Sequence, residues 1–241
     1  MICELFNNPV EVFKMFKSYI IEIEVFVRRK LRKYFLSKDR KRLENKNFVI
    51  ISNNCFGGQA YKWLKVQYNT PFAGMFMYGP CYLKMLNNFA YYIKQDLVFI
   101  DDSIYEVPSK NYPIAKLGDV ELHFLHYPTE EEASEKWYRR TERLLKETNF
   151  DNFYFVICDR DKVDTKIIKE FHQLDFKNKI SFAAKSIEGL NPDQHVSVYK
   201  EFKKNKKHSP NGKKMFKTSF LYLDFVNWIN KGEVKRTRFK G

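Results

Sequence analysis

The chain has 241 residues, of which 44% are hydrophobic and 17% aromatic, and its formal net charge is +14. This composition predicts a folded protein with a full hydrophobic core and excludes a disordered chain. No window of about 18 uncharged apolar residues occurs, so we expect no membrane-spanning helix. Residues 1–8 lack the charged and apolar regions of a secretory signal.

The positive charge is concentrated in three segments. Residues 28–42 carry nine Lys or Arg against one acidic residue, residues 200–217 carry eight against one, and residues 231–241 carry five against one. The rest of the chain is net acidic. We therefore predict a basic amphipathic helical appendage at residues 1–45, an α/β domain of catalytic type at residues 46–232, and a basic tail at residues 233–241.

The four cysteines form no C-x-x-C pair and have no regular spacing. This argues against a disulfide framework and against a structural zinc site, and we predict no bound metal. The expected compartment is the reducing cytoplasm.

The N-terminal segment has the pattern of an amphipathic helix. Pro9 suits the first position of a helix, and apolar residues return at helical spacing up to Phe35, where they mix with cations. Two interpretations stand equal. Residues 10–42 lie on an anionic membrane surface, or they pack on the domain with a solvated basic face.

Strand and helix patterns alternate through the domain. We expect strands at residues 48–51, 97–101, 112–116, 120–127, 153–158, 179–185 and 195–199, with another ending near Tyr78. We expect helices after Cys55, at residues 80–93, 129–144 and 164–174, and one last helix through Phe216 to Val226. This order predicts a three-layer, Rossmann-like α/β domain with a mostly parallel sheet.

The turn after the first strand is the leading candidate site, because it opens a helix at the carboxyl edge of the sheet. Cys55 stands there, and the N–H groups of a helix N-terminus favour a thiolate nucleophile. Asn53 and Asn54 are candidate oxyanion donors. Ser52, Gly57 and Gly58 are candidate substrate contacts, since glycine admits close approach to the backbone. The alternative is a capped turn with a half-buried cysteine.

His126 is the last residue on the apolar face of the strand predicted at residues 120–127. On a parallel sheet it would emerge at the same edge as Cys55, where an imidazole is a general base. The alternative is a structural histidine. Arg139 and Arg140 in the following helix are candidates to hold a phosphate or an acidic sugar, or they belong to an ordinary charged helix surface.

Asp159 and Asp161 form a D-x-D pattern after a buried strand. Carboxylate pairs of this kind hold a divalent cation against the diphosphate of a nucleotide sugar, because hard cations prefer oxygen ligands. These residues are the alternative site. The plainer interpretation is a turn that enters a helix.

Two stretches carry a family resemblance: Ile51-Ser-Asn-Asn-Cys-Phe-Gly-Gly, and His126-Tyr-Pro-Thr-Glu-Glu-Glu-Ala-Ser-Glu-Lys-Trp-Tyr-Arg-Arg, with Pro71-Phe72 between them. They resemble the bacterial family called domain of unknown function 1919, often labelled exopolysaccharide biosynthesis protein, over residues 46–232. The Asn-Cys turn is also similar, more remotely, to that of a capsule-biosynthesis family with a cysteine in its site. That likeness implies acyl transfer from coenzyme A.

The leading hypothesis is a cytoplasmic acyltransferase, peripheral on the inner face of the membrane. It would use a coenzyme A thioester to modify a hydroxyl of a cell-surface glycan precursor or lipid-linked sugar through Cys55 and His126. Two alternatives stay open: a metal-dependent glycosyltransferase centred on Asp159 and Asp161, and a non-catalytic glycan-binding or assembly subunit. We expect no specific nucleic-acid binding, because no nucleic-acid module is recognisable.

Overall fold

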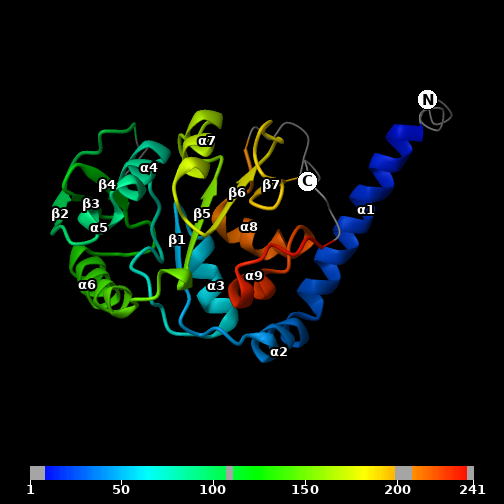
Figure 1. Cartoon of the computed structure of the whole chain (residues 1–241), viewed down its shortest axis with the longest axis horizontal. Helices are drawn as coiled ribbons and strands as arrows, with labels where there is room; N and C mark the ends of the chain where they lie inside the picture. The colour runs from blue at the N-terminus through cyan, green and yellow to red at the C-terminus, as the bar shows by residue number, and fades with distance from the viewer. Residues whose placement is uncertain (1–8, 107–110, 199–207, 238–241) are drawn as a thin grey trace.

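The computed structural model describes residues 9–106, 111–198 and 208–237. Its centre is a four-stranded parallel sheet in the order β1-β5-β6-β7 (Figure 1). The strands are β1 (Val49–Ser52), β5 (Phe153–Cys158), β6 (Asn178–Ala183) and β7 (His195–Ser197). The predicted parallel sheet is therefore confirmed, with β7 as an edge strand.

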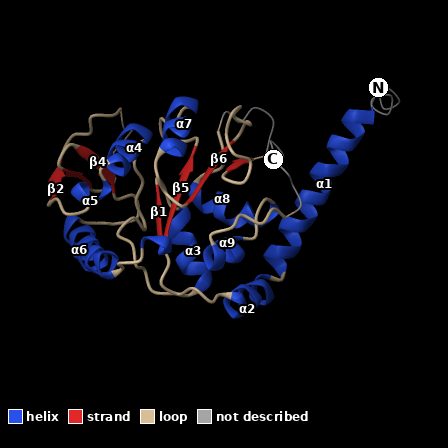
Figure 2. Cartoon of the chain, viewed as in Figure 1, coloured by secondary structure: helices blue, strands red, loops and turns tan. Residues whose placement is uncertain are grey.

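Helices cover both faces of this sheet (Figure 2). One face packs on α3 (Phe56–Leu64), α8 (Gly212–Thr218) and α9 (Phe225–Lys231). The other packs on α4 (Gly79–Asn87) and α7 (Thr165–Gln173). Both faces are apolar because β1, β5 and β6 are buried throughout, as expected of parallel strands in a three-layer domain.

A second, antiparallel sheet lies beside the α4 layer. It has the order β2-β3-β4, with β2 (Leu97–Ile100), β3 (Ile114–Leu117) and β4 (Val120–His123). It packs with α5 (Phe89–Tyr92) and α6 (Glu130–Lys146). The strand expected at residues 120–127 is therefore four residues long and pairs outside the parallel sheet. The strand expected near Tyr78 is reduced to an isolated bridge between Phe76 and His123.

The N-terminal helix is divided into α1 (Pro9–Lys30) and α2 (Arg32–Arg42). Its first turns extend away from the rest of the molecule (Figure 1), and its second half packs on the domain through the buried Ile21. Asp39 of α2 accepts hydrogen bonds from Arg28, at 2.9 Å, and from Trp63 of α3, at 2.8 Å. In the described part of the chain, no helix is both long and apolar enough to cross a membrane.

The C-terminal region departs from the predicted single helix. It breaks into α8, a 3-10 turn η4 (Ser219–Leu221) and α9, because Asp224 caps α9 by accepting the N–H of Asn227 at 3.1 Å. Asp224 also forms an ion pair with Arg42, which ties α2 to this region. Parts of the predicted appendage, residues 1–8, and of the predicted tail, residues 238–241, lie outside the described residues.

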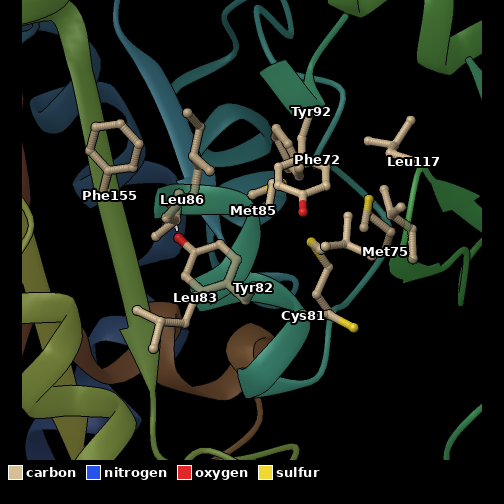
Figure 3. Close-up of a cluster of buried hydrophobic side chains, with 14 of the residues drawn as sticks. Phe72, Met75, Cys81, Tyr82, Leu83, Met85, Leu86, Tyr92, Leu117 and Phe155 are labelled. Atoms are coloured by element: carbon tan, nitrogen blue, oxygen red, sulfur yellow. Dashed lines mark hydrogen bonds between the residues drawn. The ribbon is translucent and has the colours of Figure 1, made fainter. Parts of the chain in front are cut away.

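Tyr82 joins α4 to the central sheet. Tyr82, Leu83 and Leu86 lie on the side of α4 that faces the strand of Phe155, whereas Cys81 lies on the opposite side (Figure 3). The buried Tyr82 hydroxyl lies 3.0 Å from the carbonyl oxygens of both Ile51 and Val156. One side chain therefore bonds the two paired strands β1 and β5 near their carboxyl ends.

We expect Tyr82→Phe to lower the free energy of unfolding by about 1–2 kcal/mol, because it removes a buried hydroxyl that donates to these carbonyls and leaves the ring in place. Urea denaturation of the full chain measures this. Tyr91→Phe is the matched control, because Tyr91 is 50% exposed, and it is expected to change little. Equal stability of the two variants would contradict the role given to the hydroxyl.

Two histidines share one hydroxyl on the β6 side of the sheet. The Ser181 Oγ lies 2.7 Å from His172 Nε2 and 2.7 Å from His195 Nδ1. Burial, followed by the charges of Lys179 and His195, lowers the pKa of His172 to about 4, and burial also lowers the pKa of His195. Both rings are therefore held in the neutral form at neutral pH.

We expect the protein to lose stability as the pH falls from about 6.5, the ordinary histidine value, toward about 4. The pKa of His172 is lower in the folded protein than in the unfolded chain. In this pH window the unfolded chain therefore binds a proton at His172 and the folded protein does not. Denaturation at a series of pH values measures this. His172→Gln should flatten the dependence in that window, and an unchanged slope would contradict the assignment.

Candidate functional site at the carboxyl edge of the parallel sheet

The end of β1 forms a tight turn that opens α3. The buried Ser52 hydroxyl donates to the Asn54 carbonyl at 2.6 Å and accepts the N–H of Gly57 at 3.1 Å. A Cβ at Gly57 would lie 2.9 Å from Cγ2 of Ile50, so this glycine lets α3 pack closely on its own strand. Ser52 and Gly57, predicted as substrate contacts, both hold the turn together.

The remaining predicted substrate contacts lie in the helices α3 and α6. A Cβ at Gly58 would lie 3.6 Å from Ala73, which is an ordinary van der Waals contact. Arg139 is exposed and pairs with Glu135 at 2.9 Å. Arg140 donates to the carbonyl of Ala73 at 3.1 Å and to the Tyr127 hydroxyl at 2.6 Å. The structure therefore engages Arg140 in joining α6 to the loop before α4, and leaves Arg139 on the surface.

Asn53 and Asn54 connect the β1 turn to the end of β5. The buried Asn53 side chain accepts the N–H of Cys158 at 3.1 Å and donates to its carbonyl at 3.4 Å. Asn54 donates to the Cys158 sulfur at 3.1 Å and accepts the N–H of Phe56 at 3.1 Å. The structure brings both amides to the predicted edge but engages them with the protein itself. Their oxyanion role stays a prediction.

Cys55 is half-buried at the position before the first residue of α3, as predicted. Its sulfur lies 4.0 Å from the carbonyl oxygen of Met75. Burial and then the charge of Asp161 raise the pKa of Cys55 to about 11, against the opposing effect of Lys213. The expectation of a thiolate favoured by the helix N-terminus is therefore reversed, because burial dominates. Chemistry at Cys55 requires a group that removes its proton.

Asp161 is the titratable group that acts most strongly on Cys55. Burial raises the pKa of its carboxyl group, while Arg160 and His208 lower it. Within the described residues, no donor forms a hydrogen bond with this carboxylate. Asp161 and Lys162 both adopt left-handed backbone angles, with φ of 57° and 60°. Strained residues of this kind occur preferentially at functional sites.

The backbone around Asp161 supports this conformation. The carbonyl of Asp161 accepts the N–H of Gly79, the first residue of α4, at 2.8 Å. A Cβ at Gly79 would lie 2.8 Å from the carbonyl oxygen of Lys162, so only glycine fits this close approach. The start of α4 and the left-handed turn therefore hold each other in place.

Asp159 has a different role from Asp161. Its two oxygens accept the N–H groups of Ala184 and Ser209, each at 2.6 Å. Within the described part of the chain, no group of three His, Cys, Asp or Glu side chains is placed to hold a metal ion. The structure thus uses Asp159 to join β5 to neighbouring loops. The glycosyltransferase alternative stays a prediction.

His126 does not end a strand of the parallel sheet. It lies exposed in the loop after β4, where its N–H donates to the carbonyl of Gly74 at 3.0 Å. Parallel strands therefore do not bring His126 to Cys55, because β4 is antiparallel and belongs to the second sheet. Its role as general base stays a prediction without that geometric support.

A buried histidine lies three residues earlier. His123 Nε2 lies 2.9 Å from the Glu121 carboxylate, and both side chains are fully buried. Neither ring nitrogen has a hydrogen bond of good geometry, so this approach is an electrostatic contact. His123 stacks on Phe76 and meets Tyr78 edge-on. Burial, followed by the charges of Asp161 and Glu121, raises the pKa of Tyr78. Glu121 and Asp161 therefore both act electrostatically on Tyr78.

Sequence reasoning missed Glu121 and His123 because alternation in the strand placed them on its polar face. The available signal was the tyrosines nearby, at positions 78, 105 and 112, which cover that face. Tyr78 and Tyr105 pack with ring centroids 4.0 Å apart.

The fold and this edge define an open-sheet α/β protein in which a cysteine turn and an aspartate turn end adjacent parallel strands. The chain belongs to the family described as domain of unknown function (DUF1919), whose family model matches residues 26–230. A Haemophilus influenzae protein described as uncharacterized is 33% identical over 211 residues, which is 83% of this chain and 93% of that relative. The family resemblance found in the sequence is confirmed. The links to exopolysaccharide and acyl transfer stay predictions.

The raised pKa of Cys55 predicts the rate at which iodoacetamide alkylates it. In a Cys3→Ser background the rate should rise roughly tenfold per pH unit between about pH 7 and pH 9, because the reactive thiolate fraction grows in that way below the pKa. Asp161→Asn should raise the rate at fixed pH, and Lys213→Met should lower it.

Mass spectrometry of the modified peptide measures these rates. Lys94→Met is the control. Lys94 is an exposed cation just after α5, and its charge does not affect the pKa of Cys55. A rate that levels off between about pH 7 and pH 8 would mean a thiolate at neutral pH, and would contradict the assignment.

Proposed function

We propose that this protein is an acyltransferase that uses Cys55 as nucleophile and Asp161 as general base. The donor is a coenzyme A thioester, and the acceptor is a hydroxyl of a cell-surface glycan precursor. The observation that carries the proposal is the half-buried Cys55 thiol within electrostatic range of the Asp161 carboxylate, which has no hydrogen bond within the described residues.

The acid–base properties of the two groups support their roles. A thiol with a pKa of about 11 is protonated at neutral pH and needs a base. The raised pKa of Asp161 makes its carboxylate a stronger base than an ordinary aspartate. Asp161 replaces His126 in this role, because its charge acts on Cys55.

The reaction has two balanced steps. In the first, Asp161 takes the Cys55 proton, the sulfur attacks the thioester carbonyl, and coenzyme A leaves as a thiol after taking that proton. In the second, the acceptor hydroxyl gives its proton to Asp161 and attacks the acyl-Cys55 carbonyl. The released thiolate then recovers the proton, which restores the site.

The start of α3 supplies oxyanion stabilisation in this proposal. The first N–H groups of a helix have no partner within the helix, and their dipole favours negative charge. The N–H groups of Phe56 and Gly57 already bond to Asn54 and Ser52. A Cβ at Gly58 would meet Ala73 at 3.6 Å, an ordinary contact distance, and the N–H of Gly58 is the next in the turn. We therefore assign the developing charge to Gly58 rather than to the amides of Asn53 and Asn54.

We place the reaction at the cytoplasmic side of the membrane, with the protein attached peripherally by α1. That helix exposes Phe16, Tyr19, Ile20, Ile23 and Val27, which fall at three- and four-residue spacing. Arg29 and Lys30 follow in its last turn. An apolar helix face with adjacent cations is suited to an anionic lipid surface.

We expect labelled acetyl-coenzyme A to leave its acetyl group on Cys55 when no acceptor is present. Cys55→Ala should abolish this label, and Asp161→Asn should slow its formation by about 10²–10⁴-fold, the usual contribution of a general base. Mass spectrometry of the intact protein measures the acyl-enzyme. The matched control is Cys3→Ala, which removes another thiol and should retain the label.

The pH dependence separates Asp161 from an alternative base. With Asp161 as base, the rate should fall as the pH drops through the raised pKa of this carboxyl group, and His126→Ala should acylate normally. An acyl-enzyme that forms at the wild-type rate in Asp161→Asn, or that survives Cys55→Ala, would remove the proposal.

A further inference from the structure

A groove is lined by side chains of α1, α3 and α8. Its volume is about 750 Å³, within the usual range of ligand sites. The floor is apolar, and its contributors come from α1, α3, α8 and η4: Ile21, Val25, Phe26, Trp63, Phe216 and Phe220. The two other tryptophans, Trp137 and Trp228, lie buried in the core.

The rim of this groove is strongly basic. Seven of its lining residues are Lys or Arg, and Glu22 is the one acid among them. Arg28 is neutralised by Asp39, and its guanidinium lies over the rings of Trp63 and Phe220. In the described part of the chain, no carboxylate lies within ion-pair distance of Lys62, Lys213 or Lys217. These three cations face the groove from α3 and α8 without a neutralising partner there.

We infer that this groove binds an anionic lipid, with one hydrocarbon chain on the apolar floor and a phosphate head among Lys62, Lys213 and Lys217. An apolar floor alone would fit any hydrophobic ligand. The surplus of cations selects an amphiphile whose polar end is negatively charged, because a cationic or zwitterionic head would lose the attraction of the rim.

Charge argues against two other occupants of the groove, namely a basic segment of this chain and a second copy of it. Residues 199–207 carry five Lys and one Glu, and residues 238–241 carry Arg238 and Lys240 with no acid, so these segments have the same sign as the rim. A second copy of the chain would bring the same basic rim against itself. An anionic lipid brings the opposite charge.

The groove is adjacent to two other features. The first is the exposed apolar face of α1, which includes Ile23 and Val27. These two residues do not line the groove, whereas the exposed Phe26 does. The lining of the groove also includes Gln59, whose N–H donates to the carbonyl of Cys55 at 3.2 Å, and Lys213, whose charge acts on Cys55. A lipid head held by Lys213 would thus lie within electrostatic range of Cys55.

This inference deepens the proposed function by naming a lipid-linked phosphate as the class of acceptor. The binding itself rests only on the groove and does not require Cys55 to react.

Trp63 provides the measurement. Monomeric lysophosphatidic acid, which has one acyl chain and a phosphate head, is titrated into the full chain, and tryptophan fluorescence is followed. We expect saturable binding at least tenfold tighter than that of lysophosphatidylcholine of the same chain length, and weaker binding in high salt. Inorganic phosphate alone should not compete at similar concentrations, because it lacks the chain.

Two matched pairs of variants locate the site. Val25→Glu on the groove floor should abolish binding, whereas Ile23→Glu on the exposed side of α1 should retain it. Lys62→Glu with Lys217→Glu should weaken binding at least tenfold, whereas Lys94→Glu should not. Circular dichroism confirms that each variant is folded, and a misfolded variant is replaced by Val25→Gln or Lys62→Gln with Lys217→Gln. Cys55→Ala should bind normally, which separates this test from that of the acyltransferase.

Several results would overturn the inference. Equal affinity for both lysolipids would remove the role of the phosphate. Binding to phosphatidylglycerol vesicles that depends on Ile23 and not on Val25, without binding of monomeric lipid, would assign α1 to a bilayer surface instead. A dimer in sedimentation that Val25→Glu dissociates would assign the groove to a second copy of the chain.

Discussion

The pairing of β1 with β5 is the constraint on which the candidate site depends. The two strands run parallel, with Ser52 opposite Val156. Beyond the end of β1, the Asn53 side chain continues the pairing by bonding both the N–H and the carbonyl of Cys158, the last residue of β5. A buried amide thus takes the place of a further strand residue. This arrangement holds the turn of Cys55 and the turn of Asp161 at the same sheet edge, although they are far apart in the sequence.

Much of the central fold was predictable because its signals are local. The apolar run at residues 48–51 and the change to helical spacing after Cys55 correctly located β1 and α3. The capping box also located α6, since Thr129 accepts the N–H of Glu132 as expected. The second sheet was not predictable in the same way. Alternation at residues 120–127 indicates a strand, but it does not indicate with which other strand that strand pairs.

The candidate site was predictable in its location more than in its chemistry. The strand ends of Cys55 and Asp161 do share an edge. Three features depend on tertiary contacts that spacing does not encode: the high pKa of Cys55, the use of Asn53 as a pairing element, and the placement of His126 in an exposed loop. The same holds for Glu121 and His123, whose strand is buried on both faces.

The Ser181 hydroxyl between His172 and His195 has one hydrogen to give. When it donates to one imidazole nitrogen, it can only accept from the other, so the facing nitrogen of the second ring must carry a proton. The tautomers of the two rings are therefore correlated. A change of tautomer at β7 requires a compensating change at α7, so the two elements are coupled through the orientation of a single O–H bond.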